Sequence, residues 1–282
     1  MGVSATIEVE TSTPQRTTSE ERAIRARRKD FAVRWIWRLL GYVVVLGLWE
    51  WASGTVLEEN LLPGPSRVFE TTFDLIDQGS IVESFRATLT RIGIAITISF
   101  FLGAILGILT QNAWLRGFFK DAITIGLTAP GLIWVLITAI VFGNRWYGPL
   151  IAIVLTTFAL VSVNVAEGIG SLPKDTLDMA RAFGVSLFNR NRHIVIPHLA
   201  PFLFTGLRFC FSIGWKVTVL TEIFSSSSGI GFEMRIAQTL FRQDELITWI
   251  LLFFLFALFL EKVVLQFFEN RFFRWRKDIA TA

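Results

Sequence analysis

Six segments of this sequence are long and apolar enough to cross a lipid bilayer, and they constrain the fold more than any other feature. A helix needs about 20 mainly apolar residues to span the hydrocarbon core of a bilayer. The sequence therefore predicts an all-α membrane protein with six transmembrane helices. The predicted spans are Trp35–Ser53, Phe85–Thr110, Ala122–Phe142, Pro149–Ala166, Pro201–Phe224 and Leu246–Phe268.

The composition agrees with a chain that has much of its surface in lipid. Charged residues make up 18% of the 282 residues, against roughly 25% in soluble domains. Phenylalanine (27) and tryptophan (10) far outnumber tyrosine (2). The net charge of +4 does not indicate nucleic-acid binding, because the charges collect at the ends of the apolar segments. That distribution is typical of membrane topology.

The lysines and arginines predict the orientation of the chain. Cytoplasmic segments of membrane proteins keep an excess of positive charge. If both termini are cytoplasmic, 18 of the 27 Lys and Arg residues fall inside and only five outside. We therefore expect a mobile cytoplasmic tail at 1–30, a transmembrane domain at 31–270 and a basic cytoplasmic tail at 271–282.

Two of the predicted spans contain residues that shape helix packing. Gly103 and Gly107 are four residues apart in the second span, a spacing that permits close approach of another helix. Pro130 and Gly131 interrupt the third span, so we expect a bend there. Freed carbonyls in a membrane need protein or water as partners, and this predicts that the third span lies inside the bundle. The alternative is that the glycines and the proline serve ordinary helix packing.

The sequence offers no pattern for catalysis, metal binding or a bound cofactor. Cys210 is the single cysteine and lies in an apolar stretch, which is typical of a buried packing residue. His193 and His198 are too few to build a zinc site with it. No G-x-x-x-x-G-K-[ST] phosphate loop is present, so the chain is not expected to bind ATP itself.

The longest predicted cytoplasmic loop, residues 167–197, has the pattern of two short helices. Pro173 suits the start of the first helix and Gly184 its end. A second helix over about Ser186–Ile196 then leads to Pro197 at the membrane. The first helix places Leu177, Ala180, Arg181 and Gly184 on one face. From the spacing alone, this face can lie on lipid headgroups or fill a groove of a soluble partner.

A resemblance distinguishes between these two possibilities. The run D-M-A-R-A-F-G, followed after nine residues by I-V-I-P, resembles the EAA loop of ABC-importer permeases, in which E-A-A precedes a glycine and an I-x-L-P sequence. Asp178 stands in place of the glutamate and Met179 in place of the first alanine. The resemblance implies that this loop contacts an ATPase. The residues it assigns to ATPase coupling are Leu177, Asp178, Met179, Ala180, Arg181, Phe183, Gly184, Phe188, Ile196 and Pro197.

Two further stretches, Leu62–Thr71 and Gly206–Met234, resemble the nitrate, sulfonate and taurine branch of these permeases. The resemblance implies a type I importer permease in a prokaryotic plasma membrane, which carries a small, often anionic solute. The implied partners are two ATP-binding subunits, a second permease subunit and an extracytoplasmic substrate-binding protein. The candidate residues of the translocation pathway are Pro130, Trp215, Lys216, Glu222, Ser226 and Gly229.

Lys216 has two interpretations, because a charged residue inside a span usually faces water or a partner. In the first, Lys216 lines the pathway and attracts an anion. In the second, it has a structural role: it extends to the outer interface or pairs with a carboxylate of another helix. Glu222 is a poor partner, since six helical residues place it on a different side of the same helix.

The alternative function for the whole chain is a secondary transporter or channel that works without an ATPase. Proteins of that class usually show repeated halves.

Overall fold

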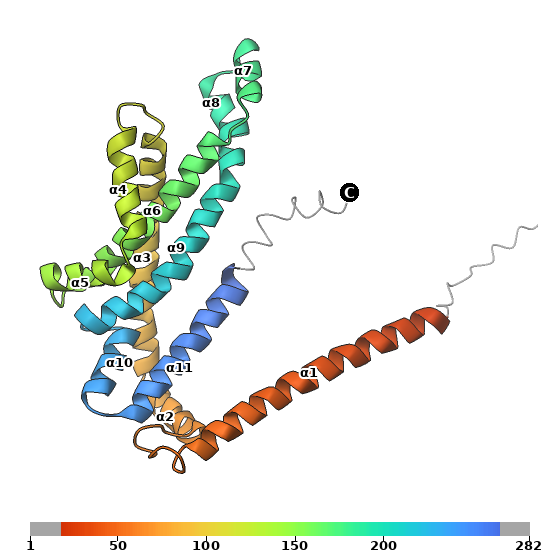
Figure 1. The fold of residues 1–282 in the computed structure, drawn as a ribbon, viewed down its shortest axis with the longest axis vertical. Helices are drawn as coiled ribbons and strands as arrows, with labels where there is room; N and C mark the ends of the chain where they lie inside the picture. The colour runs from red at the N-terminus through yellow and green to blue at the C-terminus, as the bar shows by residue number, and fades with distance from the viewer. Residues whose placement is uncertain (1–17, 266–282) are drawn as a thin grey trace, which may run out of the picture.

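The computed structural model describes residues 18–265, and their regular structure is helical (Figure 1). Long helices form a bundle, and short helices cap its two ends. The elements are α1 (Thr18–Ala52), α2 (Pro65–Asp77), α3 (Ser80–Leu109), α4 (Arg116–Thr128), α5 (Gly131–Phe142), α6 (Gly148–Gly170), α7 (Lys174–Ala182), α8 (Leu187–Arg190), the π-helix η1 (Asn191–Val195), α9 (Ile196–Ser225), α10 (Ile230–Thr239), α11 (Gln243–Phe259) and the π-helix η2 (Leu260–Leu265).

Four helical stretches of the described chain are long and apolar enough to cross a membrane, and α4 with α5 adds a fifth if this bent pair counts as one span. The four are Ser80–Leu109, Gly148–Gly170, Leu187–Ser225 and Gln243–Val263. They correspond to the second, fourth, fifth and sixth predicted spans. The first predicted span, Trp35–Ser53, lies in α1 and is not among them, so the number six stays a prediction.

Helices α3, α6 and α9 form the centre of the bundle, and glycine lets them approach closely. A Cβ atom on Gly103 would lie 2.5 Å from the carbonyl oxygen of Phe158, and one on Gly107 would lie 2.6 Å from that of Ser162. Both distances are too short for a side chain, so only glycine allows this contact between α3 and α6. The predicted role of the Gly103–Gly107 pair is confirmed.

The third predicted span is two helices that meet at 98°. Helix α4 ends where the Ala129 amide donates to the Ile125 carbonyl, and Pro130 then lies in extended backbone before α5 begins. The predicted bend is confirmed. The prediction that this span lies inside the bundle is wrong for the single chain, because α5 buries only Val135 and Thr138. One face of α5 packs on α6 and α9, and its apolar opposite face is exposed.

Helix α1 packs against α2 and then extends away from the bundle (Figure 1). The Glu50 carboxylate accepts hydrogen bonds from the backbone amide (3.2 Å) and hydroxyl (2.8 Å) of Ser66, in the first turn of α2. Residues 18–30, which we expected in a mobile tail, are the first part of α1. Their sequence is rich in Glu, Arg and Ala, which are strong helix formers. The rest of that predicted tail and the tail at 271–282 lie outside the described residues.

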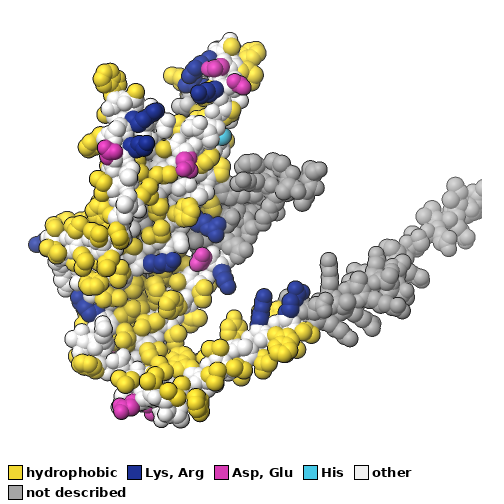
Figure 2. All heavy atoms as spheres, viewed as in Figure 1, with side chains coloured by type: hydrophobic (Ala, Val, Ile, Leu, Met, Phe, Trp, Pro, Cys, Tyr) yellow, Lys and Arg dark blue, Asp and Glu magenta, His cyan; other side chains and the backbone are white. Residues whose placement is uncertain are grey.

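The two ends of the bundle carry different elements. The turn between α3 and α4 lies at the same end as α7 and α8, which we call the coupling-loop end (Figure 1). Helices α2 and α10 lie at the opposite end, which we call the outer end. This separation agrees with the grouping of loops that the lysines and arginines predict. Figure 2 shows charged side chains gathered on α7 and the neighbouring tips, while the middle of the bundle is mainly hydrophobic with a few charged side chains among the apolar ones.

Candidate functional site: the coupling loop and the outer turn

The first helix of the coupling loop ends in a Schellman motif built around Gly184. The Val185 amide donates to the Ala180 carbonyl (2.9 Å), and the Gly184 amide donates to the Arg181 carbonyl (3.0 Å). Gly184 has φ +67°, in the left-handed region that favours glycine. The predicted end of the helix is confirmed, and α7 begins directly after Pro173.

Of the side chains that the resemblance assigns to ATPase contact, some are buried in the loop and others are exposed. Ala180 is buried and Leu177 is half-buried, so this face of α7 holds the loop together. Phe183 is 81% exposed and Phe188 is 70% exposed, although both are large apolar residues. Asp178 and Arg181 pair with each other at 3.1 Å on the exposed surface. The other exposed members of the set are Met179, Gly184, Ile196 and Pro197.

The second helix of the loop continues into the membrane, which the sequence did not predict. We expected it to stop before Pro197, but α8, η1 and α9 form one helical stretch of 39 residues, Leu187–Ser225. The Ile196 amide donates to the Asn191 carbonyl, five residues earlier, in the π-helical turn. A π turn changes the register of the backbone bonds just before Pro197, whose missing N–H would otherwise interrupt the helix.

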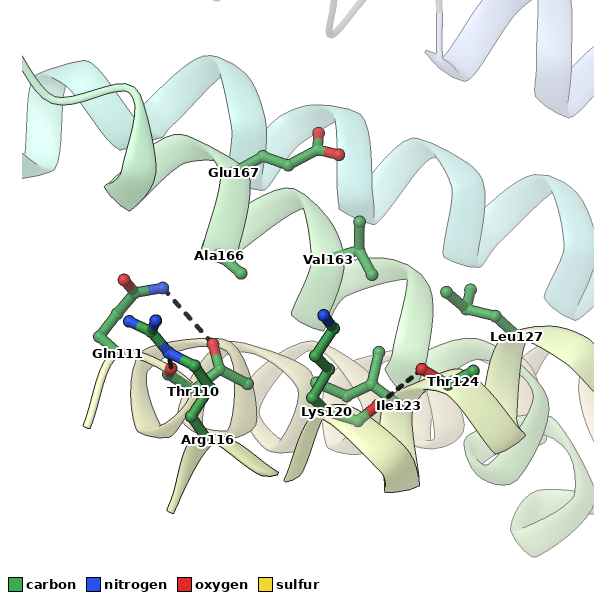
Figure 3. Close-up of a pocket in the computed structure, with 10 residues that line it drawn as sticks. All are labelled: Thr110, Gln111, Arg116, Lys120, Ile123, Thr124, Leu127, Val163, Ala166 and Glu167. Atoms are coloured by element: carbon green, nitrogen blue, oxygen red, sulfur yellow. Dashed lines mark hydrogen bonds between the residues drawn. The ribbon is translucent and has the colours of Figure 1, made fainter. Parts of the chain in front are cut away.

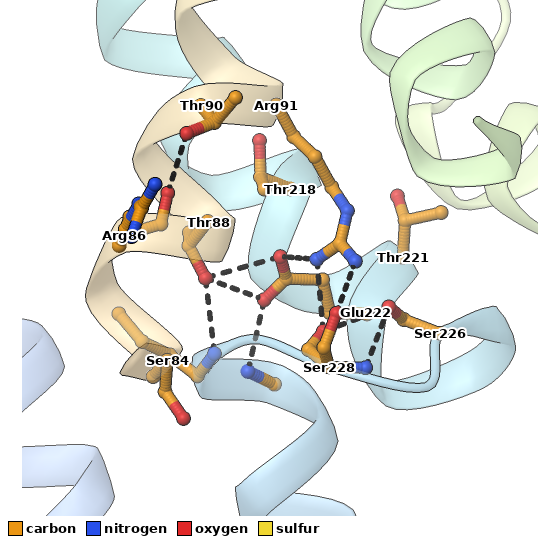
Figure 4. Close-up of polar contacts among 12 residues, drawn as sticks. Ser84, Arg86, Thr88, Thr90, Arg91, Thr218, Thr221, Glu222, Ser226 and Ser228 are labelled. Carbon is orange, nitrogen blue, oxygen red and sulfur yellow. Dashed lines mark hydrogen bonds and ion pairs between the residues drawn. The ribbon is translucent and has the colours of Figure 1, made fainter. Parts of the chain in front are cut away.

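At the outer end, the Glu222 carboxylate is the centre of a buried polar network (Figure 4). It is fully buried, and it accepts hydrogen bonds from the Arg91 guanidinium (2.6 Å), the Thr88 hydroxyl (2.9 Å) and the Gly231 amide (3.1 Å). The Thr88 hydroxyl in turn accepts from the Ile230 amide (3.0 Å). These bonds connect α3, α9 and α10. A charge removed from water needs such partners, and Glu222 has both a counter-charge and neutral donors.

The same arginine fixes the turn between α9 and α10, residues 225–231, which we call the outer turn. Arg91 donates to the Ser228 carbonyl (2.8 Å) and hydroxyl (2.6 Å). Arg235 donates to the Ser226 carbonyl (2.6 Å). Gly229 has φ +102°, and a Cβ atom there would collide with the Glu222 carboxylate. The outer turn is therefore held from inside the bundle, and its shape requires glycine.

Just beyond this turn, α10 carries a partly buried carboxyl group, Glu233. The Ser84 hydroxyl donates to it at 3.4 Å. Burial raises the pKa of Glu233, and the nearby charges of Glu245 and Glu83 raise it further. The outer end therefore gathers three acidic side chains beside the outer turn.

The six predicted pathway residues do not share one surface in this chain. Glu222, Ser226 and Gly229 are buried in the outer turn and its network. Trp215 is buried too, and its ring stacks on Phe253 with centroids 5.1 Å apart.

The remaining two are exposed: Pro130 at the bend between α4 and α5, and Lys216 on α9. Lys216 lines a cavity of about 40 Å³ together with Glu261 of η2. The geometry thus keeps open both interpretations of Lys216, as a pathway residue and as a neighbour of a carboxylate on another helix.

Arg91 and Thr88 are site residues that sequence reasoning missed. The signal for Arg91 was present, because an arginine within an apolar span requires a partner. Glu222 is the acidic residue within the fifth predicted span, but Arg208 and Lys216 also lie within spans, so charge alone did not select Arg91 as its partner. Thr88 carried no comparable signal.

Comparison with known families identifies this architecture. Residues 99–277 match the family described as the binding-protein-dependent transport system inner membrane component. The chain belongs to this family. It is a permease of an ABC importer, a membrane protein that works with an ATPase and a substrate-binding protein, and not a secondary transporter or channel. The match includes the coupling loop, the fifth span and the outer turn.

Curated relatives belong to the same class of permease. The chain is 28% identical over 205 residues to the nitrate import permease protein of Leptolyngbya laminosa, which covers 68% of this chain and 72% of that protein. It is 24% identical over 263 residues to the taurine transport system permease protein of Escherichia coli, with 88% and 95% covered. It is 22% identical over 265 residues to a permease assigned to aliphatic sulfonates in Bacillus subtilis, with 93% and 95% covered.

Solved structures support the fold. An amino acid ABC transporter crystallised with histidines superimposes with a TM-score of 0.59 at 17% identity, over 71% of this chain and 97% of that chain. The inward-facing methionine transporter MetNI superimposes with a TM-score of 0.53 at 14% identity, over 67% and 96%. The predicted type I importer permease fold is thereby confirmed.

Proposed function

We propose that this permease carries a small anionic solute into the cell, driven by ATP that a separate subunit binds and hydrolyses. The relatives named above carry nitrate, taurine or sulfonates, and a bicarbonate permease of Synechococcus elongatus is 28% identical to this chain. These solutes share an oxygen-rich anionic group. Under this proposal the coupling-loop end is cytoplasmic, because its loops are basic and positive charge is kept on the cytoplasmic side. Both termini, whose segments are also basic, are then cytoplasmic.

The single observation that carries the proposal is the exposure of the coupling loop. Phe183 and Phe188 are large apolar side chains exposed on one short loop, and an exposed apolar patch is typical of a surface that binds a partner protein. Both lie on the loop that projects from one end of the bundle (Figure 1). They fit a hydrophobic groove of an ATPase subunit, while Asp178 and Arg181 supply polar contacts around it.

Two permease subunits complete the proposed assembly; a homodimer is the simpler case, and a heterodimer with a related second permease is the alternative. The exposed apolar side chains of α1 and α5 support this, because the rest of the chain leaves most of them uncovered. Ile140 of α5, for example, is 83% exposed. The mass of the purified complex tests this point. A complex with one permease chain and two ATPase subunits would contradict it.

Within this proposal the pathway residues have two roles. Lys216 and Pro130 line the passage, since both side chains are exposed. Trp215, Glu222, Ser226 and Gly229 keep the shape of the passage and of the outer turn, which receives the substrate-binding protein.

The experiment that tests the proposed coupling compares two phenylalanines of equal exposure at opposite ends. Phe183→Ser removes an apolar contact from the coupling loop, and we expect loss of ATPase co-purification and of solute uptake into proteoliposomes. Phe241→Ser removes a side chain that is 83% exposed at the turn between α10 and α11, and it should leave ATPase binding intact. Normal ATPase binding and uptake by Phe183→Ser would refute the assignment of the loop.

A further inference from the structure

A cavity of about 340 Å³ opens at the coupling-loop end, between the end of α3, α4 and α6 (Figure 3). Its volume is within the range of sites that hold small molecules. Arg116 and Lys120 of α4 lie on one side, and Val163 and Ala166 of α6 lie on the other. Helices α7 and α8 of the coupling loop and the outer turn do not contribute to it.

Neither positive charge of this cavity forms an ion pair with a described residue. Arg116 and Lys120 are four residues apart, so both side chains lie on the same face of α4. The Arg116 Nε donates to the Thr110 carbonyl (3.1 Å), which holds the guanidinium in place and leaves its terminal nitrogens for a ligand. The Lys120 ammonium makes no bond to any residue between 18 and 265. The site is therefore both positively charged and partly preorganised.

The acid in the lining does not neutralise these charges. Glu167 belongs to the cavity, but its carboxylate points away from Arg116 and Lys120, toward the opposite side of α6 (Figure 3). Neutral donors and acceptors stand beside the cations: the Gln111 amide and the hydroxyls of Thr110 and Thr124.

The rest of the cavity wall is apolar. Ile123 and Leu127 of α4 face Val163 and Ala166 of α6. A bare inorganic ion would leave this wall in contact with water, whereas an ion with an attached hydrocarbon group would cover it. The lining thus favours an amphiphilic anion.

We propose that this cavity binds an organic anion from the coupling-loop side: a sulfonate, carboxylate or phosphate group on a short apolar body. The anionic oxygens lie between Arg116 and Lys120, and the apolar body lies against Val163 and Leu127. This site is distinct from the proposed translocation residues and does not depend on which solute is imported. Its occupant is a free cytoplasmic anion or the headgroup of an anionic lipid.

Occupancy has a consequence for the loop. Helix α6 ends at Gly170, and α7 begins only a few residues later at Lys174. An anion held between α4 and α6 therefore favours one position of the segment that leads into the coupling loop.

The test uses the complex purified with its ATPase in nanodiscs of zwitterionic phosphatidylcholine, with butane-1-sulfonate as the probe in calorimetric titration. We expect the wild type to bind the probe and Lys120→Gln to weaken binding on the order of tenfold, since a hydrogen bond to a charged group is lost. Arg145→Gln, at an exposed arginine outside the cavity, is the matched control and should bind like the wild type. Because Lys120 is exposed and has no bonding partner in the described chain, this substitution should not affect folding.

A second arm identifies the source of the anion. The titration is repeated in nanodiscs that contain phosphatidylglycerol. If this lipid weakens binding of the probe to the wild type, a headgroup occupies the site. If it has no effect, the site takes a free anion. The proposal is overturned if the wild type in phosphatidylcholine does not bind the probe, or if Lys120→Gln binds it as tightly as the wild type does.

Discussion

Replacing Arg91 with methionine tests whether the buried pair with Glu222 holds the outer end of the bundle. The side chains of Arg91 and Glu222 are 5% and 0% exposed. The substitution removes the counter-charge of Glu222 and both bonds to Ser228, and leaves only Thr88 and Gly231 as donors to the carboxylate. Removing one partner of a buried ion pair costs about 3–5 kcal/mol.

The double variant Arg91→Met, Glu222→Met separates the charge from the packing. An apolar replacement of a whole buried pair is often nearly neutral, so the double variant should be more stable than Arg91→Met alone. With about 2–4 °C per kcal/mol for a chain of this size, the single variant should unfold roughly 6–20 °C below the wild type. Thermal denaturation of the detergent-purified protein, followed by tryptophan fluorescence, measures both.

Arg86→Met is the control, because Arg86 is an exposed arginine on the same helix. It should change stability by no more than about 0.5 kcal/mol. Two results would contradict this reasoning: Arg91→Met unfolding at the same temperature as Arg86→Met, or the double variant unfolding at a lower temperature than Arg91→Met. In either case the Arg91–Glu222 ion pair does not stabilise the fold.

The remaining predictions concern glycine and Lys216. Gly184→Val should strain the turn by about 1–2 kcal/mol and reduce substrate-stimulated ATP hydrolysis. Gly184→Asn should keep most of that activity, because asparagine tolerates positive φ. No atom lies within 4 Å of a Cβ at this position, so the strain comes from the backbone conformation and not from a steric clash. Gly103→Ala should separate α3 from α6 and cost about 1–3 kcal/mol in denaturation experiments, while Gly117→Ala, with open space around it, should be neutral. Lys216→Met should assemble normally but slow uptake of an anion, with part of the rate kept by Lys216→Arg; unchanged uptake would leave Lys216 a structural role only.

The parts of the fold that could be predicted from the sequence depend on local chemistry. Gly184 ends α7 because its left-handed conformation is set by the residue itself. Pro130 produces the bend because it lacks an N–H. The spacing of Gly103 and Gly107 indicates close packing before the partner helix is known.

The features that could not be predicted depend on what surrounds a residue in space. Nothing near Pro197 in the sequence indicates that a π turn carries the helix through it. The exposure of α5 was missed because the freed backbone at Pro130 was expected to require burial in the same chain. Lys120 and Glu167 carry opposite charges and line one cavity, yet the direction of each side chain is a property of the folded bundle.

The long helix Leu187–Ser225 connects the two functional ends of this permease. At 1.5 Å per residue, its 39 residues extend about 58 Å. It begins at α8 in the coupling loop, and Glu222 near its other end is bound to α3 and α10. A displacement of the loop therefore moves a continuous rod whose outer end is fixed by Arg91, and we expect the rod to tilt around that point. Under this hypothesis Arg91→Met reduces substrate-stimulated ATP hydrolysis even though it leaves the loop unchanged. Full stimulation in that variant would mean that the outer end responds to the loop through other helices.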